Sequence, residues 1–78
     1  PNPFNGETTL YFRLENPRHV TLKVFNIIGQ EILTLANGSY PSGEHHVALS
    51  TGGWTSGVYV YRLYVGNTVL IRKLTLMR

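Results

Sequence analysis

From Glu7 to Glu15 the side chains alternate cleanly between a mainly apolar side and a mainly polar side, and this period of two constrains the fold more than any other feature of the chain. Such a period, with one apolar face, is typical of a half-buried β-strand. Four residues are predicted to share the buried face: Thr8, Leu10, Phe12 and Leu14. The apolar period of about 3.6 residues that marks a helix persists nowhere, so we predict an all-β protein with no helix longer than a single turn.

Two further strands are predicted between residues 20 and 36. Three residues form the inward face of the first of them: Val20, Leu22 and Val24. Phe25 lies on its outer side, and a turn over 26–29 ends it, with Gly29 supplying a positive φ that other residues resist. The next strand, over 30–36, does not alternate cleanly, so its register stays open, and a β-bulge would account for the break.

Turn-forming residues divide the middle of the chain. Asn37-Gly38 and Pro41-Ser42-Gly43 mark a loop, which predicts that the third strand ends near Ala36. A fourth strand follows over 44–50, with three residues on its inward side: His45, Val47 and Leu49. Residues 52–57 form a glycine-rich bend around Trp54, whose ring we expect to plug one end of a small core.

The last third of the chain is predicted to be a long β-hairpin with a two-residue turn at Gly66-Asn67, of type I′ or II′. This turn sets the register of three pairs: Leu63 with Leu70, Tyr59 with Leu74, and Gly57 with Leu76. The same register places Arg72 opposite Tyr61 on the inward face. A buried unpaired guanidinium costs several kcal/mol, so Arg72 must stack on Tyr61, reach an open edge, or be turned outward by a bulge.

Six strands joined by short turns in 78 residues predict an immunoglobulin-like antiparallel β-sandwich of about six to seven strands. In such domains a tyrosine sits two residues before a core position that often holds cysteine. Tyr59 and Tyr61 fit this pattern, so the Tyr59 hydroxyl is expected to fold back onto the preceding bend. Five residues are therefore predicted to have structural roles: Gly29, Trp54, Gly57, Tyr59 and Tyr61.

Charge is distributed unequally along the chain. Residues 1–44 hold all four glutamates, whereas residues 45–78 hold four cations and no acid: Arg62, Arg72, Lys73 and Arg78. A basic segment of this kind predicts an acidic partner or an anionic surface. The alternative is that these cations only keep an edge strand soluble.

The chain offers little material for catalysis, and we predict no catalytic residue, metal site or cofactor. Cysteine and aspartate are absent. His45 and His46 are adjacent, so on a strand they point to opposite faces and cannot readily share a metal ion. The few basic and aromatic neighbours on the hairpin make a weak case for nucleic acid. No signal-peptide pattern or apolar run long enough for a membrane helix is present.

Several short motifs, in order along nearly the whole chain, resemble the C-terminal sorting domains, type A, of the type IX (Por) secretion system. They are Asn2–Asn5 followed by Thr8–Phe12, Val20–Asn26, Ile28–Ile32, Pro41–His45, Ser56–Leu63 and Arg72–Leu76. The pattern is also similar to the immunoglobulin-like domain of flagellar hook-capping proteins. Two departures fall in one loop: Trp54 replaces a smaller apolar residue, and residues 50–53 lack the aspartate often found there.

The resemblance implies a non-catalytic signal at the C-terminal end of a larger secreted or cell-surface protein of Bacteroidetes or related bacteria. It implies that residues 1–6 link the domain, over 7–78, to a preceding one. The outer-membrane secretion machinery would recognise the domain after passage through the periplasm, and anionic lipopolysaccharide would be a further partner after processing. Five positions match the part of the family that carries the signal: Arg72, Lys73, Leu74, Leu76 and Arg78.

Two alternatives stay open. The chain could be an accessory module that binds carbohydrate or protein within a secreted enzyme, or a spacer without a partner. A carbohydrate site requires a flat exposed aromatic surface, so an exposed Trp54 beside Tyr40 or Tyr64 would favour it.

Overall fold

The computed structural model describes residues 3–78; the first two residues of the expected linker, Pro1 and Asn2, lie outside this range. Six strands make up the described chain: β1 (Glu7–Leu14), β2 (Arg18–Asn26), β3 (Glu31–Tyr40), β4 (Gly43–Ser50), β5 (Gly57–Val65) and β6 (Thr68–Leu76). All neighbouring strands are antiparallel. Across these residues no helix is long and apolar enough to cross a membrane.

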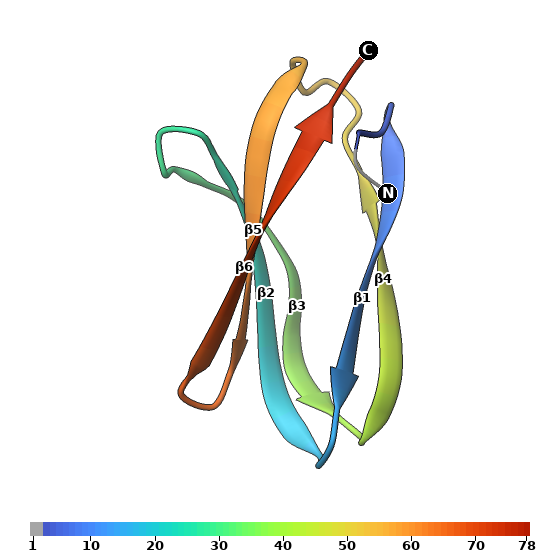
Figure 1. The fold of residues 1–78 in the computed structure, drawn as a ribbon, viewed down its shortest axis with the longest axis vertical. Coiled ribbons are helices and arrows are strands. Elements are labelled where there is room, and N and C mark those ends of the chain that lie inside the picture. Colours follow the sequence, from blue (N-terminus) through green and yellow to red (C-terminus); the bar gives the residue numbers. More distant parts are fainter. Residues whose placement is uncertain (1–2) are drawn as a thin grey trace.

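The strands form two sheets of unequal size. One contains four strands in the order β3-β2-β5-β6, and the other contains only β1 and β4. In Figure 1 the two-stranded sheet stands to the right of the larger one, and the two sheets enclose the core between them. This arrangement confirms the predicted antiparallel β-sandwich.

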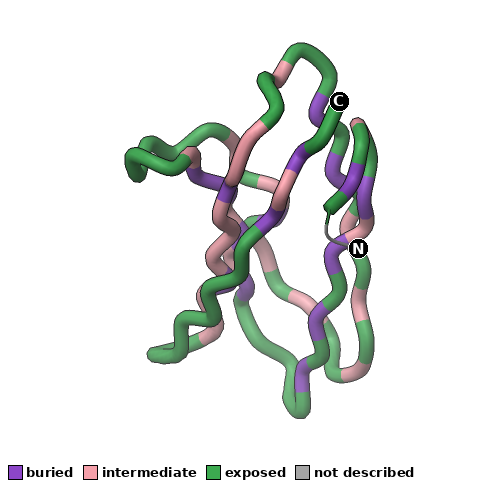
Figure 2. The backbone as a smooth tube through the Cα atoms, turned by 45° about the horizontal axis from the view of Figure 1, so that its top comes forward, coloured by how far each residue is buried: buried purple, intermediate pink, exposed green. Residues whose placement is uncertain are grey.

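The core consists of the predicted inward faces. Thr8, Leu10, Phe12 and Leu14 are all buried, and Val20, Leu22 and Val24 are almost completely so. Figure 2 shows the buried positions recurring along the strands, whereas the tip of the β5–β6 hairpin is exposed. Alternation along β1 and β2 therefore identified their buried sides.

Phe25 is an exception to this division, because it is buried although it lies on the outer face of the larger sheet. The guanidinium carbon of Arg62 lies 4.4 Å from the centre of its ring, a cation–π arrangement that covers the aromatic surface. One of the four cations of the basic segment is thus engaged in the sheet itself.

The prediction that Asn37-Gly38 forms a loop is wrong, because both residues belong to β3 and pair with Thr21 and Val20 of β2. Asn-Gly favours a turn locally, but here the β2–β3 ladder continues to Arg18 and Tyr40 and pairs both residues within it. The chain turns instead at Pro41-Ser42. The register shifts after Leu22 and after Val24, so the break in the β3 pattern reflects irregular pairing.

The β2–β3 turn is held by Asn26. Its side-chain oxygen accepts hydrogen bonds from the backbone N–H groups of Ile28 (3.2 Å) and Gln30 (2.9 Å). Gly29 adopts a φ of 88°, the positive value expected for it. Beside the turn, a hydrogen bond from the Lys23 ammonium lowers the pKa of Glu31.

Candidate recognition surface of the carboxyl-terminal hairpin

The β5–β6 hairpin has the register that the two-residue turn predicted. Val65 pairs with Thr68 across the turn, and the ladder continues to Gly57 and Leu76. Gly66 has a φ of 58°, while no residue other than glycine has a positive φ in the described chain, so the turn has the conformation of type II′. All three predicted pairs, Leu63 with Leu70, Tyr59 with Leu74 and Gly57 with Leu76, are present.

The inward face of β6 is exposed near the hairpin turn and buried towards the end of the strand. Leu74 and Leu76 are buried, with 4% and 1% of their surface exposed. Leu70 and Arg72 lie on the same side but are exposed, with Leu70 keeping 44% of its surface. The structure thus resolves the problem of Arg72: its guanidinium is at an open edge of the sandwich, where it donates a hydrogen bond to the carbonyl of Ile71 (2.9 Å).

The five positions expected to carry recognition therefore divide into two groups. Leu74 and Leu76 fill the core and are not accessible to a partner while the domain is folded. Arg72 and Lys73 are exposed on opposite faces of β6, and Arg78 follows the strand. Of these five positions, only the three cations expose a side chain that a partner of the folded domain could contact.

Arg78 is held against the bend that follows β4. Its Nε donates a hydrogen bond to the carbonyl of Trp54 (2.7 Å), one terminal nitrogen donates to the carbonyl of Thr51, and its backbone N–H donates to the Ser56 hydroxyl (3.0 Å). Sequence reasoning missed this role, because the acceptors lie 22 to 27 residues earlier. Arg78 is a structural clamp as well as a cation.

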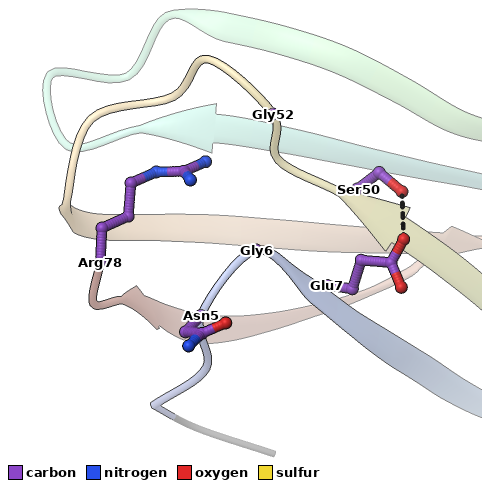
Figure 3. A pocket seen from close by; sticks show the side chains of 6 residues that line it. All are labelled: Asn5, Gly6, Glu7, Ser50, Gly52 and Arg78. Carbon is purple, nitrogen blue, oxygen red and sulfur yellow. Dashed lines mark hydrogen bonds between the residues drawn. The ribbon is translucent and has the colours of Figure 1, made fainter.

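Figure 3 shows the shallow hollow, of about 550 Å³, that Arg78 enters. Asn5, Gly6 and Glu7 lie on one side of it and Ser50 and Gly52 on the other, and the Ser50 hydroxyl donates to Glu7 over 3.4 Å. Thr51 is completely buried there, and both its hydroxyl and its N–H donate to the Gly6 carbonyl, each over 2.9 Å. These hydrogen bonds close one end of the sandwich beside the hollow.

We expect Arg78→Ala to lower the free energy of unfolding by about 1–2 kcal/mol, because the two carbonyls it now satisfies are left to water. Trp54 fluorescence during urea unfolding measures the change, since the Trp54 ring packs against the core. Arg13→Ala is the control, because that side chain is 69% exposed and its contact with Glu44, itself 81% exposed, is weak at 4.0 Å. An Arg78→Ala variant as stable as the control would contradict the clamp.

The segment before β1 is packed against the end of β6. Phe4 is buried and forms a parallel bridge with Leu76; its N–H donates to the Thr75 carbonyl (3.0 Å), and its carbonyl accepts from Met77 (2.8 Å). Within the expected linker, Phe4 thus contributes to the core. The incoming chain and the end of β6 lie side by side, as Figure 1 also shows.

The Tyr59 hydroxyl folds back onto the preceding bend as predicted, an arrangement known as a tyrosine corner. The ring of Tyr59 is buried, and its hydroxyl donates a hydrogen bond to the backbone carbonyl of Thr55 (2.7 Å) in the preceding bend. The Trp54 ring lies 4.9 Å from the Tyr59 ring and is partly buried against it. Tyr61, at the position of the expected cysteine, also packs against the core. These contacts give Trp54 a packing role.

The aromatic surface that a carbohydrate site would need is not formed by the residues named for it. Tyr40 precedes β4 and Trp54 follows it, so they lie at opposite ends of that strand; Trp54 and Tyr64 are likewise at opposite ends of β5. Tyr40 packs edge-on against Phe12 and against His45. In residues 3–78 no group of three histidine, cysteine or acidic side chains could hold a metal ion.

Comparisons with known proteins agree with this architecture. The model of the family described as "Secretion system C-terminal sorting domain" matches residues 1–77. Among solved structures, the crystal structure of the Ig1 domain of mouse SynCAM 2 is similar with a TM-score of 0.50 and 16% sequence identity, over 96% of this chain and 84% of that one. At that identity the likeness shows an immunoglobulin-like fold alone. No curated protein sequence matches the chain.

Proposed function

Because the chain belongs to the family of secretion system C-terminal sorting domains, we propose that it directs a larger protein across the outer membrane by the type IX system, through contacts of the folded domain. The match over residues 1–77 is the observation that carries this proposal. The domain would act without catalysis, and the protein attached to it would pass through the periplasm to the surface or the medium.

The exposed cations of β6 are the proposed contact with the secretion machinery. Arg72 and Lys73 are exposed on β6, the edge strand of the larger sheet. An acidic surface on the partner would complement them, which raises both the rate and the specificity of association. Leu74, Leu76 and Arg78 support the signal by holding β6 in place. Attachment to anionic lipopolysaccharide after processing stays a prediction from the family resemblance.

A reporter fusion tests the proposal. Residues 1–78 are placed after a periplasm-directed reporter in a bacterium with type IX secretion, and the reporter is measured on the surface, in the medium and in the periplasm. We expect export with the natural sequence and roughly tenfold less with Arg72→Gln combined with Lys73→Gln, because the complementary charge is lost. A reporter that stays in the periplasm with the natural sequence contradicts the sorting function.

A matched control separates position from net charge. Ser42→Glu combined with Ala48→Glu also lowers the net charge by two, but these exposed residues lie in the β3–β4 turn and on β4. This variant should be exported normally. If it fails as badly as the β6 variant, the machinery responds to overall charge and the β6 surface is not the contact.

A further inference from the structure

The unequal sheets leave part of the sandwich uncovered. Four strands face two, and the inward side of β6 near the hairpin tip has no strand opposite it. Leu70 and Arg72 therefore stay exposed there, although they continue the face on which Leu74 and Leu76 are buried. The space corresponds to the place of a third strand beside β1.

Two adjoining hollows of about 640 and 120 Å³ occupy this place. The larger begins at the β1–β2 turn and the hairpin tip, the smaller continues it along β1 towards Arg72, and they share Arg13, Leu63 and Leu70. We call them together the β1–β6 groove. Its floor includes apolar atoms of Tyr61, Leu63 and Leu70.

The backbone of β1 borders this groove. Within residues 3–78, β1 pairs with β4 alone, so its other edge presents N–H and C=O groups that no strand satisfies. Tyr11, Phe12 and Arg13 of β1 line the groove together with Leu70 and Arg72 of β6. An unpaired edge above an apolar floor is the setting in which an extended peptide adds to a sheet, with main-chain hydrogen bonds and pockets for alternate side chains.

The charge of the groove selects the peptide. Arg13, Arg18 and Arg72 line it, against a single glutamate, Glu15. Glu44 lies 4.0 Å from Arg13, but both side chains are largely exposed, so this pair is weak. Near the hairpin tip, the guanidinium of Arg18 lies over Gly66, where an added Cβ would be 2.6 Å from its nitrogen. Three guanidinium groups around an apolar floor fit a strand that carries carboxylates.

We propose that the β1–β6 groove binds an extended acidic segment of a partner protein, which adds to β1 as the third strand of the smaller sheet. One inward side chain of that segment is apolar and rests on Leu70, while its carboxylates reach Arg13 and Arg72. A second copy of this chain fits less well, because its own β6 would bring like charges to the groove. The inference goes beyond the sorting function and does not depend on it.

The probe is a peptide of alternating valine and glutamate, as long as β1, with both ends blocked; a valine–lysine peptide is its counterpart. In a ¹H–¹⁵N NMR titration of the chain, we expect the acidic peptide to shift the amides of β1 and of Leu63, Leu70 and Arg72. The affinity should fall as salt is added, because charged groups at the surface are screened. The basic peptide should leave the spectrum unchanged.

Two variants with the same change in net charge locate the binding. Arg72→Gln should weaken binding of the acidic peptide by roughly fivefold to tenfold, because it removes one guanidinium from the groove. Ile71→Glu, at the next position of β6 but on the outer face and 54% exposed, should change it less than about twofold. Arg13→Gln should also weaken binding of the acidic peptide, because it removes a guanidinium from the β1 side of the groove.

Three outcomes overturn the proposal. One is equal binding of the acidic and basic peptides, and another is shifts confined to residues outside the groove. The third is a spectrum that changes with protein concentration at the same β1 and β6 amides, because the occupant is then a second copy. The natural chain and each variant are first compared without peptide, so that loss of folding is recognised as such.

Discussion

Leu76→Ala is expected to lower the free energy of unfolding by about 3–4 kcal/mol, the largest effect of any single truncation in β6. The side chain is 1% exposed and lies where β6 meets both Gly57 of β5 and the incoming Phe4. Removing it leaves a cavity between β5 and the segment that contains Phe4. A small domain of this length is stable by only about 4–12 kcal/mol, so much of that stability would be lost. Urea unfolding followed by circular dichroism measures the change.

Leu70→Ala is the matched control for Leu76→Ala. It makes the same chemical change in the same strand and on the same face, but at a position that is 44% exposed. We expect a loss below about 1 kcal/mol there, because most of the removed surface was already in contact with water. Equal losses of unfolding free energy in Leu76→Ala and Leu70→Ala would contradict the division of β6 into a buried end and an exposed end. The comparison also shows why loss of export in a Leu76 variant would not identify a direct contact.

Tyr59→Ala is expected to cost about 3–5 kcal/mol, because it removes a buried ring and a partly buried hydrogen bond together. The ring packs in the core and against Trp54, and the hydroxyl bonds to the Thr55 carbonyl. Tyr59→Phe keeps the ring and loses only that hydrogen bond, so about 1–2 kcal/mol should be lost. Denaturant unfolding of both variants separates the two contributions.

Tyr11→Phe controls for removal of a hydroxyl in general, because Tyr11 is 72% exposed. Its effect should be within about 0.5 kcal/mol of zero. If Tyr59→Phe lost no more stability than Tyr11→Phe, the hydrogen bond of the Tyr59 hydroxyl would not stabilise the domain. If Tyr59→Phe were as damaging as Tyr59→Ala, the hydroxyl and not the ring would hold the bend.

The basic segment has more than one role in the folded domain. Arg62 covers Phe25, and Arg78 satisfies two carbonyls, so neither is simply a solubilising charge. Arg72 and Lys73 are both exposed, on opposite faces of β6. The export and peptide-binding experiments decide between recognition of a partner and solubility alone. If the domain is a spacer, or β6 is only solubilising, a charge change on β6 has the same effect as a matched change elsewhere.

The hairpin shows how far local pattern can reach. A glycine followed by asparagine between two apolar runs determined the turn, and the turn then determined the partner of every residue from Gly57 to Leu76. The problem of Arg72 was also visible, because the register put a guanidinium on the inward face. Its solution was not, since the open edge exists only because the opposite sheet has two strands.

The failure at Asn37-Gly38 has the opposite cause. The local preference of these two residues is for a turn, but their pairing with Thr21 and Val20 places them inside a ladder that connects distant residues. Phe4 is a similar case, because its pattern is that of a linker and its burial depends on the end of β6. In both places long-range pairing outweighed a short-range signal.

By itself, then, the sequence determined the strand class, the buried side of most strands, the hairpin register and the tyrosine corner, because these depend on a period of two and on turns a few residues long. Only the tertiary structure decided the length of β3, the docking of Phe4, the carbonyls held by Arg78 and the uncovered groove beside β1. Each of these depends on which strands become neighbours, and that is set by how residues far apart in the chain fill one core.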